Sequence, residues 1–140
     1  MTISWGTLGI EWNKPIFTVF VRESRFTKQL LEANPEFTIN IPHGTFDPKI
    51  LGFCGSKSGF DTDKIQELGL TLEPAKTISV PGIKQLPLTL ECKVIYKQKQ
   101  AFEAIPQEHQ TTFYPPEVDN KPDIHTAYYG EIVSSYLIKD

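Results

Sequence analysis

The stretch LTLECKVIYK, residues 88–97, decides the fold class because its apolar and polar residues alternate. One face of the expected strand carries the apolar side chains of Leu88, Leu90, Cys92, Val94 and Tyr96. The other face carries Thr89, Glu91, Lys93 and Lys97. Such alternation predicts a strand with one face in the core. Cys92 then lies on the core side, where a thiol packs as a small hydrophobic group and takes no part in chemistry.

Three other stretches predict further strands. Residues 16–22 are almost continuously apolar, rich in β-branched and aromatic side chains, as in a central strand covered on both faces. Residues 36–41 alternate, with Phe37, Ile39 and Ile41 on one face. Residues 128–137 predict a long closing strand, in which Gly130 marks a bulge or a place where another backbone or a ligand comes near.

The remaining segments predict short helices and loops. Ser24 is expected to cap a helix that runs to about Ala33, with Phe26, Leu30 and Leu31 facing inward. Asp47-Pro48 starts a turn or two of helix, and Asp61 caps another helix that Gly69 ends. Residues 106–123 hold four prolines and predict a loop. Many strands without a βαβ rhythm indicate one mainly β domain over residues 1–140, an antiparallel barrel with short helical excursions.

Composition excludes several classes of function. The chain has 140 residues, 39% of them hydrophobic, and a net charge of −3, which lacks the basic excess of a nucleic-acid-binding protein. No window approaches the roughly 18 apolar residues of a membrane span, and no signal peptide is visible, so we expect a cytoplasmic protein. The two cysteines form neither a disulfide framework nor a zinc site, and no cluster of His, Asp and Glu predicts a metal site.

The Gly/Ser-rich run of residues 51–64 predicts an anion-binding loop. Glycine lets main-chain N–H groups approach a ligand, Ser56 and Ser58 can donate hydrogen bonds, and Lys57 adds a positive charge. The alternative is a solvated turn followed by the helix cap at Asp61. The usual dinucleotide-binding and P-loop motifs are absent from the sequence, so a nucleotide would have to be held in another way.

Four segments in order along the chain resemble the flavin reductase-like family of FMN-binding split barrels, the flavoredoxin group in particular. These segments are Met1–Gly6, Arg22–Thr27, Cys54–Asp61 and His125–Tyr136. The resemblance implies a Greek-key split β-barrel that forms a homodimer and holds FMN at the subunit interface. NADH or NADPH is then the possible electron donor, and a redox protein is a possible partner.

The resemblance also implies which residues bind the cofactor. The main chain of Thr2, Ile3, Ser4 and Trp5 would lie along the isoalloxazine edge, although a core or interface role for Trp5 remains open. A helix would start in the next motif, and its N-terminus would face an anion; the residues are Arg22, Ser24, Arg25, Phe26 and Thr27. The alternative is a simple capping arrangement with solvated arginines. Cys54, Gly55, Ser56 and Lys57 would form the loop near the phosphate or ribityl chain.

His125 matches a family position on the open side of the flavin, so it is a candidate for the nicotinamide side of the site. The alternative is a solvated histidine before a strand, and His43 and His109 carry no signal. Hydride transfer to flavin needs chiefly proximity and orientation, so no residue is named as catalytic.

One departure from the family concerns the start of the chain. Family members usually carry a further segment, including the first barrel strand, before the Met-Thr-Ile-x-Trp motif, whereas here the motif begins the sequence. We expect an edge strand that needs covering, by the partner subunit for instance, and flavin affinity could be lost. Three functions follow: an NAD(P)H-dependent flavin reductase, a flavoredoxin-like electron carrier without its own NAD(P)H activity, or a degenerate dimeric barrel that binds no flavin.

Overall fold

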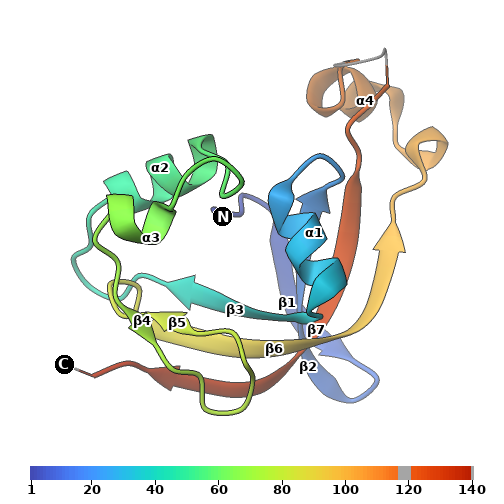
Figure 1. Cartoon of the computed structure of the whole chain (residues 1–140). Helices are drawn as coiled ribbons and strands as arrows, with labels where there is room; N and C mark the ends of the chain where they lie inside the picture. Colours follow the sequence, from blue (N-terminus) through green and yellow to red (C-terminus); the bar gives the residue numbers. More distant parts are fainter. Residues whose placement is uncertain (117–120, 140) are drawn as a thin grey trace.

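A five-stranded antiparallel sheet forms the body of the molecule (Figure 1). The structure is a computed structural model and describes residues 1–116 and 121–139. The strands of this sheet are β1 (Gly6–Glu11), β2 (Lys14–Arg22), β3 (Glu36–Ile41), β6 (Leu88–Lys99) and β7 (His125–Leu137). They follow the spatial order β1-β2-β7-β6-β3, so that β1 and β3 are the two edges. A small second sheet pairs β4 (Leu72–Glu73) with β5 (Gly82–Ile83). The fold is mainly β, as the sequence predicts.

The core lies where β2, β3, β6 and β7 face helix α1 (Phe26–Ala33). Its buried members are Val19, Val21, Leu31, Phe37, Ile39, Cys92 and Tyr128. The prediction for Cys92 is confirmed, because burial raises the pKa of its thiol to about 12 and leaves it uncharged. A smaller apolar cluster of Ile50, Leu70 and Leu86 packs beneath helices α2 (Lys49–Ser56) and α3 (Lys64–Glu67).

The first part of the polar face of β6 is buried at Thr89 and Glu91, contrary to the expectation of a strand with one solvated face, whereas Lys93 and Lys97 are exposed as expected. Glu91 has no exposed surface, and its carboxylate accepts hydrogen bonds from the main-chain N–H of Lys76 at 2.7 Å and of Thr77 at 2.8 Å. The Tyr136 hydroxyl donates to the same group at 2.7 Å. Burial alone would raise the pKa of Glu91, but these donors lower it below its ordinary value. The sequence signal failed because a segment distant in sequence supplies the donors.

Gly130 lies beside a bulge, as predicted, but the groups that come near it are the side chains of Phe37 and Cys92 and not another backbone. A Cβ at this position would lie 2.4 Å from Phe37 Cζ and 2.8 Å from Cys92 Cβ. Gly130 pairs with Val94, directly beside a bulge in β6 between Val94 and Tyr96. This bulge also changes the direction of the following side chains, so that Tyr96 is exposed although the alternation places it in the core.

Two predicted helix caps are wrong. Arg25 occupies the N-cap of α1 without a side-chain hydrogen bond, while the Ser24 hydroxyl donates to Asp123 Oδ2 at 2.6 Å. Helix α3 begins at Lys64 and is capped by Asp63, whose carboxylate accepts from the main-chain N–H of Ile65 and Gln66, so Asp61 is not its cap. In α1, Leu31 is buried as expected but Leu30 is exposed.

Two segments predicted as loops contain helices. Helix α2 extends into the Gly/Ser-rich run and ends at Ser56. Two glycines disfavour this helix, but Ile50 packs in the smaller apolar cluster and stabilises it. Within the Pro-rich segment, α4 (Gln107–Phe113) follows a 3₁₀ turn, η1 (Phe102–Ala104), and residues 117–120 of that segment lie outside the described residues.

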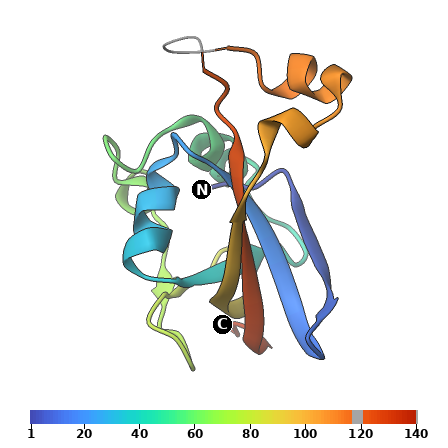
Figure 2. The same ribbon diagram turned by 90° about the vertical axis from the view of Figure 1, so that its right-hand side faces the viewer.

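The hairpin of β1 and β2 was missed by the sequence analysis. Trp12 and Asn13 connect the strands with φ values of 49° and 54°, the left-handed backbone of a two-residue hairpin turn. Every residue of β1 is exposed, and Leu8 and Ile10 are 67% and 75% exposed. The expected uncovered edge strand is therefore present, and Figure 2 shows it at one side of the sheet.

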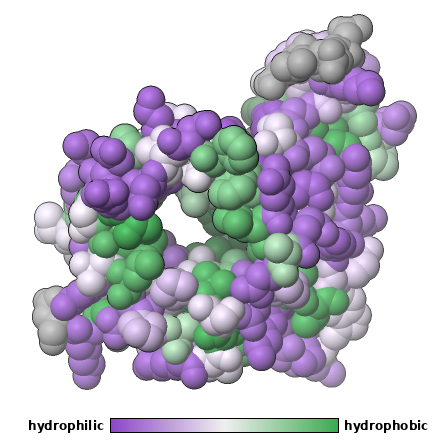
Figure 3. All heavy atoms as spheres, in the orientation of Figure 1, coloured by the Kyte–Doolittle hydropathy of each residue, from purple (hydrophilic) through white to green (hydrophobic). Residues whose placement is uncertain are grey.

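The first residues of the chain lie over the sheet, between α2 and α1 (Figures 1 and 2). In the space-filling view the surface between these helices is hollowed and bordered in part by hydrophobic side chains (Figure 3). The strands and helices thus bring the chain start next to the end of β2 and the start of α1. No helix among the described residues is both long and apolar enough to span a membrane.

Candidate functional site

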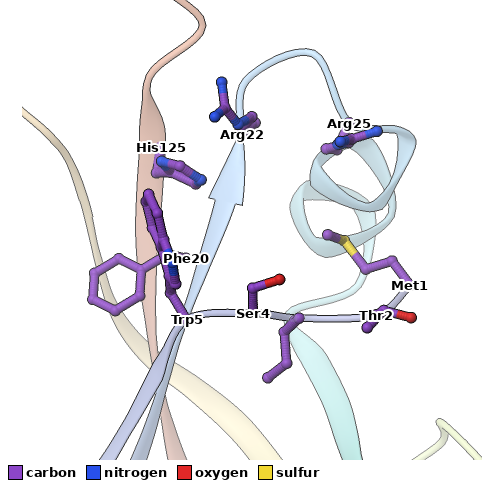
Figure 4. A pocket seen from close by; sticks show the side chains of 9 residues that line it. Met1, Thr2, Ser4, Trp5, Phe20, Arg22, Arg25 and His125 are labelled. Carbon is purple, nitrogen blue, oxygen red and sulfur yellow. The ribbon is translucent and has the colours of Figure 1, made fainter. Parts of the chain in front are cut away.

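A cavity of about 250 Å³ opens where the first residues of the chain meet β2, α1 and β7. Its lining residues are Met1, Thr2, Ile3, Ser4, Trp5, Phe20, Arg22, Arg25 and His125. Figure 4 shows them arranged around one space, with the arginines and His125 on one side and the N-terminal segment opposite. Three of the four segments that carry the family resemblance therefore contribute to a single cavity.

The N-terminal segment is held in place by helix α2 and the core. The Thr2 hydroxyl donates to the main-chain oxygen of Leu51 at 2.6 Å, and a Cβ added at Gly55 would lie 3.5 Å from Thr2 Cβ. Ile3 packs against the core of the main sheet. Residues 1–5 belong to no strand or helix, so their main-chain N–H and C=O groups are not used in a sheet.

Trp5 forms an aromatic wall of the cavity with Phe20 and His125, which also line it, and Phe113 packs against Trp5 outside the lining. Its ring lies 5.2 Å from Phe113 in an edge-to-face arrangement and 5.0 Å from the His125 ring. Phe20, at the end of β2, lies beside Trp5 in Figure 4. Such rings offer a flat apolar surface to a planar ligand.

Arg22 is fixed by the segment that precedes β7. Its guanidinium donates to the main-chain oxygens of Phe113 at 2.8 Å and of Asp123 at 3.2 Å, and it lies 5.5 Å from the centre of the Tyr114 ring. These contacts use part of its donor capacity and keep the positive charge at the rim of the cavity.

Arg25 is a cation of the cavity that lacks a protein partner among the described residues. Its guanidinium makes no hydrogen bond or ion pair with the residues that the structure describes, although Arg25 lines the cavity at the N-terminus of α1. The first N–H groups of a helix and a free guanidinium both favour an anion. Ser24, in contrast, already has a protein partner, because its N–H and hydroxyl donate hydrogen bonds to the Asp123 carboxylate at 3.0 Å and 2.6 Å.

His125 is the first residue of β7 and is only 6% exposed, so the alternative of a solvated histidine is wrong. Its Nδ1 lies 2.9 Å from the Tyr114 hydroxyl. Burial lowers the pKa of His125, the nearby Arg22 and Arg25 lower it further, and Asp123 opposes them. The imidazole is consequently neutral near pH 7.

The structure separates the predicted site residues into two groups. Around the cavity it brings together Thr2, Ile3, Ser4, Trp5, Arg22, Arg25 and His125. Outside the lining it leaves Ser24, Phe26, Thr27, Cys54, Gly55, Ser56 and Lys57. Phe26 packs against Phe60 with 5.7 Å between ring centres, and Lys57 lies exposed just beyond α2.

Two contributors were missed by the sequence analysis. Phe20 belongs to a strand that was expected to be wholly core, and Tyr114 lies in the Pro-rich segment that was expected to be a loop. Phe20 stands two residues before the Arg22 motif, which was the available signal; nothing in the sequence marked Tyr114. The described residues contain no group of three or more His, Cys, Asp and Glu that could hold a metal ion.

Fold and cavity together define a domain of the split-barrel type: a mainly antiparallel sheet, few helices, and a site built beside the edge hairpin. The chain belongs to the flavin reductase like domain family, whose sequence model matches residues 1–140.

Two solved structures show the same fold. Flavoredoxin of Desulfovibrio vulgaris (Miyazaki F) superposes with a TM-score of 0.71 at 22% identity over 98% of this chain and 60% of that one. An FMN-binding protein from Thermus thermophilus, solved with bound p-hydroxybenzaldehyde, gives 0.67 at 20% identity over 98% and 62%.

A curated protein of Archaeoglobus fulgidus, described as uncharacterized, is 31% identical over 96 residues, which are 68% of this chain and 52% of that protein. The chain thus spans about half the length of the curated relatives it matches.

Proposed function

We propose that the cavity binds FMN and that the protein passes hydride from NADH or NADPH to the flavin. The observation that carries this proposal is the convergence of an irregular N-terminal segment, two arginines and an aromatic wall on one cavity. Membership of the flavin reductase like domain family supports a flavin as the ligand, and the shared fold of the FMN-binding protein from Thermus thermophilus supports FMN in particular.

The residues present fit the polar parts of a flavin nucleotide. Main-chain groups of residues 2–5 are free of sheet pairing and can meet the donors and acceptors along the edge of the ring system. Arg25 would bind the phosphate, since its guanidinium has no acceptor among the described residues and lies at the start of α1. Arg22 would add positive charge while it remains bonded to Phe113 and Asp123.

Trp5 and Phe20 would position the flat ring, and His125 would line the side open to a nicotinamide. The flavin, when bound, supplies the hydride acceptor; the protein supplies orientation and a partly dry surface. A neutral His125 adds no positive charge where the nicotinamide approaches.

We infer further that the site is shared between two subunits. A cavity of about 250 Å³ is smaller than the roughly 300–1,000 Å³ of typical small-molecule sites, so a single chain encloses only part of such a ligand. The exposed strand β1 carries Leu8 and Ile10, and a second, apolar groove runs past Leu8, Pro15, Leu90, Ile132 and Val133. A homodimer that pairs this face would cover it and protect the edge strand.

Electron carriage is the second candidate, and the structural similarity to flavoredoxin favours it. A carrier needs the same cavity for FMN but no access for a nicotinamide. Reduction by a partner protein, and not by NADH or NADPH, would identify this function.

Binding is tested by mixing the protein with excess FMN and separating the two by gel filtration. The proposal expects flavin absorbance to elute with the protein at about one FMN per chain. A matched sample that contains the double variant Arg22→Ala, Arg25→Ala should elute without flavin. Elution of the wild-type protein without flavin at saturating FMN would contradict the proposal.

A further inference from the structure

Three residues form a chain of hydrogen bonds behind the cavity. Gln100 follows β6, Tyr114 follows α4, and His125 begins β7. The Tyr114 hydroxyl lies 3.0 Å from Gln100 Oε1 and 2.9 Å from His125 Nδ1. The main-chain N–H of His125 donates to the same Oε1 at 3.3 Å. Tyr114 is 5% exposed, so these contacts lie away from solvent.

The main-chain contact determines the orientation of the Gln100 amide. A main-chain N–H can only donate, so the amide atom beside it is the oxygen. The opposite orientation would place an NH₂ group against an N–H group and leave both without an acceptor. Gln100 Oε1 therefore accepts two hydrogen bonds, one from His125 N–H and one from Tyr114.

The Tyr114 contact then determines the proton on His125. A tyrosine hydroxyl has one proton, and here that proton points to Gln100 Oε1. The contact at 2.9 Å between the hydroxyl oxygen and Nδ1 is consequently a bond that Nδ1–H donates. In a neutral imidazole with a proton on Nδ1, the other nitrogen, Nε2, has only a lone pair.

We propose that Gln100 and Tyr114 hold His125 as the Nδ1–H tautomer, with an unprotonated Nε2 that accepts a hydrogen bond from an N–H or O–H group of a ligand in the cavity. His125 lines the cavity beside Trp5 (Figure 4). Nε2 has no hydrogen-bond partner among the described residues. Among those residues, every side-chain nitrogen or oxygen that is fully buried has a partner, so Nε2 is not fully buried. Because His125 lines the cavity, a ligand there can reach Nε2.

The fixed tautomer selects the chemistry of the ligand. The carboxamide N–H of a nicotinamide is a suitable donor, and this part of the inference rests on the proposed function. A ligand that presents only acceptors to Nε2 would face a lone pair and gain no hydrogen bond. Gln100 and Tyr114 are thus positioning residues, and the burial that lowers the pKa of His125 keeps the acceptor available near neutral pH.

The tautomer is measured directly on flavin-free protein by long-range ¹H–¹⁵N correlation NMR at about pH 8, where histidines are neutral. We expect His125 to show a protonated Nδ1 and an unprotonated Nε2. His43 and His109 serve as references in the same spectrum. A protonated Nε2 on His125 in the wild-type protein would overturn the inference, whatever the protein does with flavin.

Two variants test the origin of the tautomer. Tyr114→Phe removes the acceptor of Nδ1–H, and Gln100→Ala frees the tyrosine proton to point at Nδ1. Each variant should convert His125 to the Nε2–H form that imidazole prefers in water. Tyr136→Phe removes a hydroxyl that bonds to Glu91 elsewhere and should leave His125 unchanged. An unchanged tautomer in both folded variants would refute the role of the pair, and the wild-type spectrum decides the tautomer if the variants fail to fold.

The ligand class is tested separately with FMN-loaded protein and NAD⁺. A hydrogen bond from the carboxamide should shift the Nε2 resonance, whereas the nicotinic acid analogue, whose carboxylate has no N–H to donate, should not produce that shift. Equal shifts with both ligands, or no shift at saturating NAD⁺, would refute the carboxamide contact. The tautomer result stands independently, so the two failures are distinguishable.

Discussion

Replacement of Arg25 by alanine tests where the phosphate binds. Arg25 lies at the N-cap of α1, lines the cavity and makes no side-chain hydrogen bond to the described residues. The substitution therefore breaks no described side-chain contact, and the fold should remain intact. This distinguishes it from Arg22, whose loss would also break the bonds to Phe113 and Asp123.

The magnitude follows from the number and kind of bonds that are lost. A hydrogen bond to a charged group contributes about 1.5–3 kcal/mol. Because Arg25 is exposed in the free chain, screening favours the lower part of this range. We expect FMN to bind about 10- to 30-fold more weakly. Riboflavin, which has the same ring but no phosphate, should bind equally to the wild-type protein and the variant.

Lys57→Ala is the matched control. It removes the same charge from an exposed side chain that lies outside the cavity, so only a screened long-range effect remains, with a loss of less than about fivefold. Fluorescence quenching of FMN and riboflavin at one fixed salt concentration measures the six affinities of the wild-type protein and the two variants. A larger loss for Lys57→Ala than for Arg25→Ala would refute the assignment and place the phosphate at the end of α2.

Three further predictions concern assembly, the fold and His125. Ile10→Glu should convert a dimer into a monomer in light scattering, because it charges a 75% exposed side chain of the edge strand; a wild-type protein that is already monomeric at micromolar concentration would contradict the dimer. Glu91→Gln should lower the free energy of unfolding at pH 7 by about 1.5–3 kcal/mol. The difference between the two proteins should shrink below about pH 4, because the lowered pKa of Glu91 gives stability that is lost as the carboxylate becomes protonated. A constant difference in denaturant titrations down to pH 2 would argue against this. His125→Asn should slow flavin reduction by less than about 100-fold, with a nearly flat pH–rate profile. Since burial lowers the pKa of His125, wild-type stability should also fall below about pH 6.5, where the unfolded histidine takes up a proton, and the variant should lose that part of the pH dependence.

The alternation of apolar and polar residues was sufficient to predict the strands that bury one face. Strand β3 runs over the predicted residues 36–41, and the bulge beside Gly130 was predicted from that glycine. The interior of β6 was only half predicted, because the donors that satisfy Glu91 come from a distant segment. The helix through Ser56 was missed because its stability comes from packing around Ile50.

Short motifs predicted more of the site than composition did. The motifs at the chain start, at Arg22 and Arg25, and at His125 meet at one cavity because β2 and β7 are adjacent strands that pair Arg22 with His125. The role of Tyr114 could not be predicted, since its contact with His125 depends on how the segment before β7 folds back. The hydrogen bond from Ser24 to Asp123 could not be predicted either, because the two residues are 99 positions apart in the sequence.

FMN in the cavity should lie where a nicotinamide can reduce it. Anaerobic stopped-flow mixing of the FMN-loaded protein with NADH, and separately with NADPH, measures this directly at the visible absorbance of the flavin. We expect the bound flavin to be bleached in a phase whose rate saturates with nucleotide concentration. Persistent flavin absorbance with both nucleotides would contradict the reductase and favour the electron carrier.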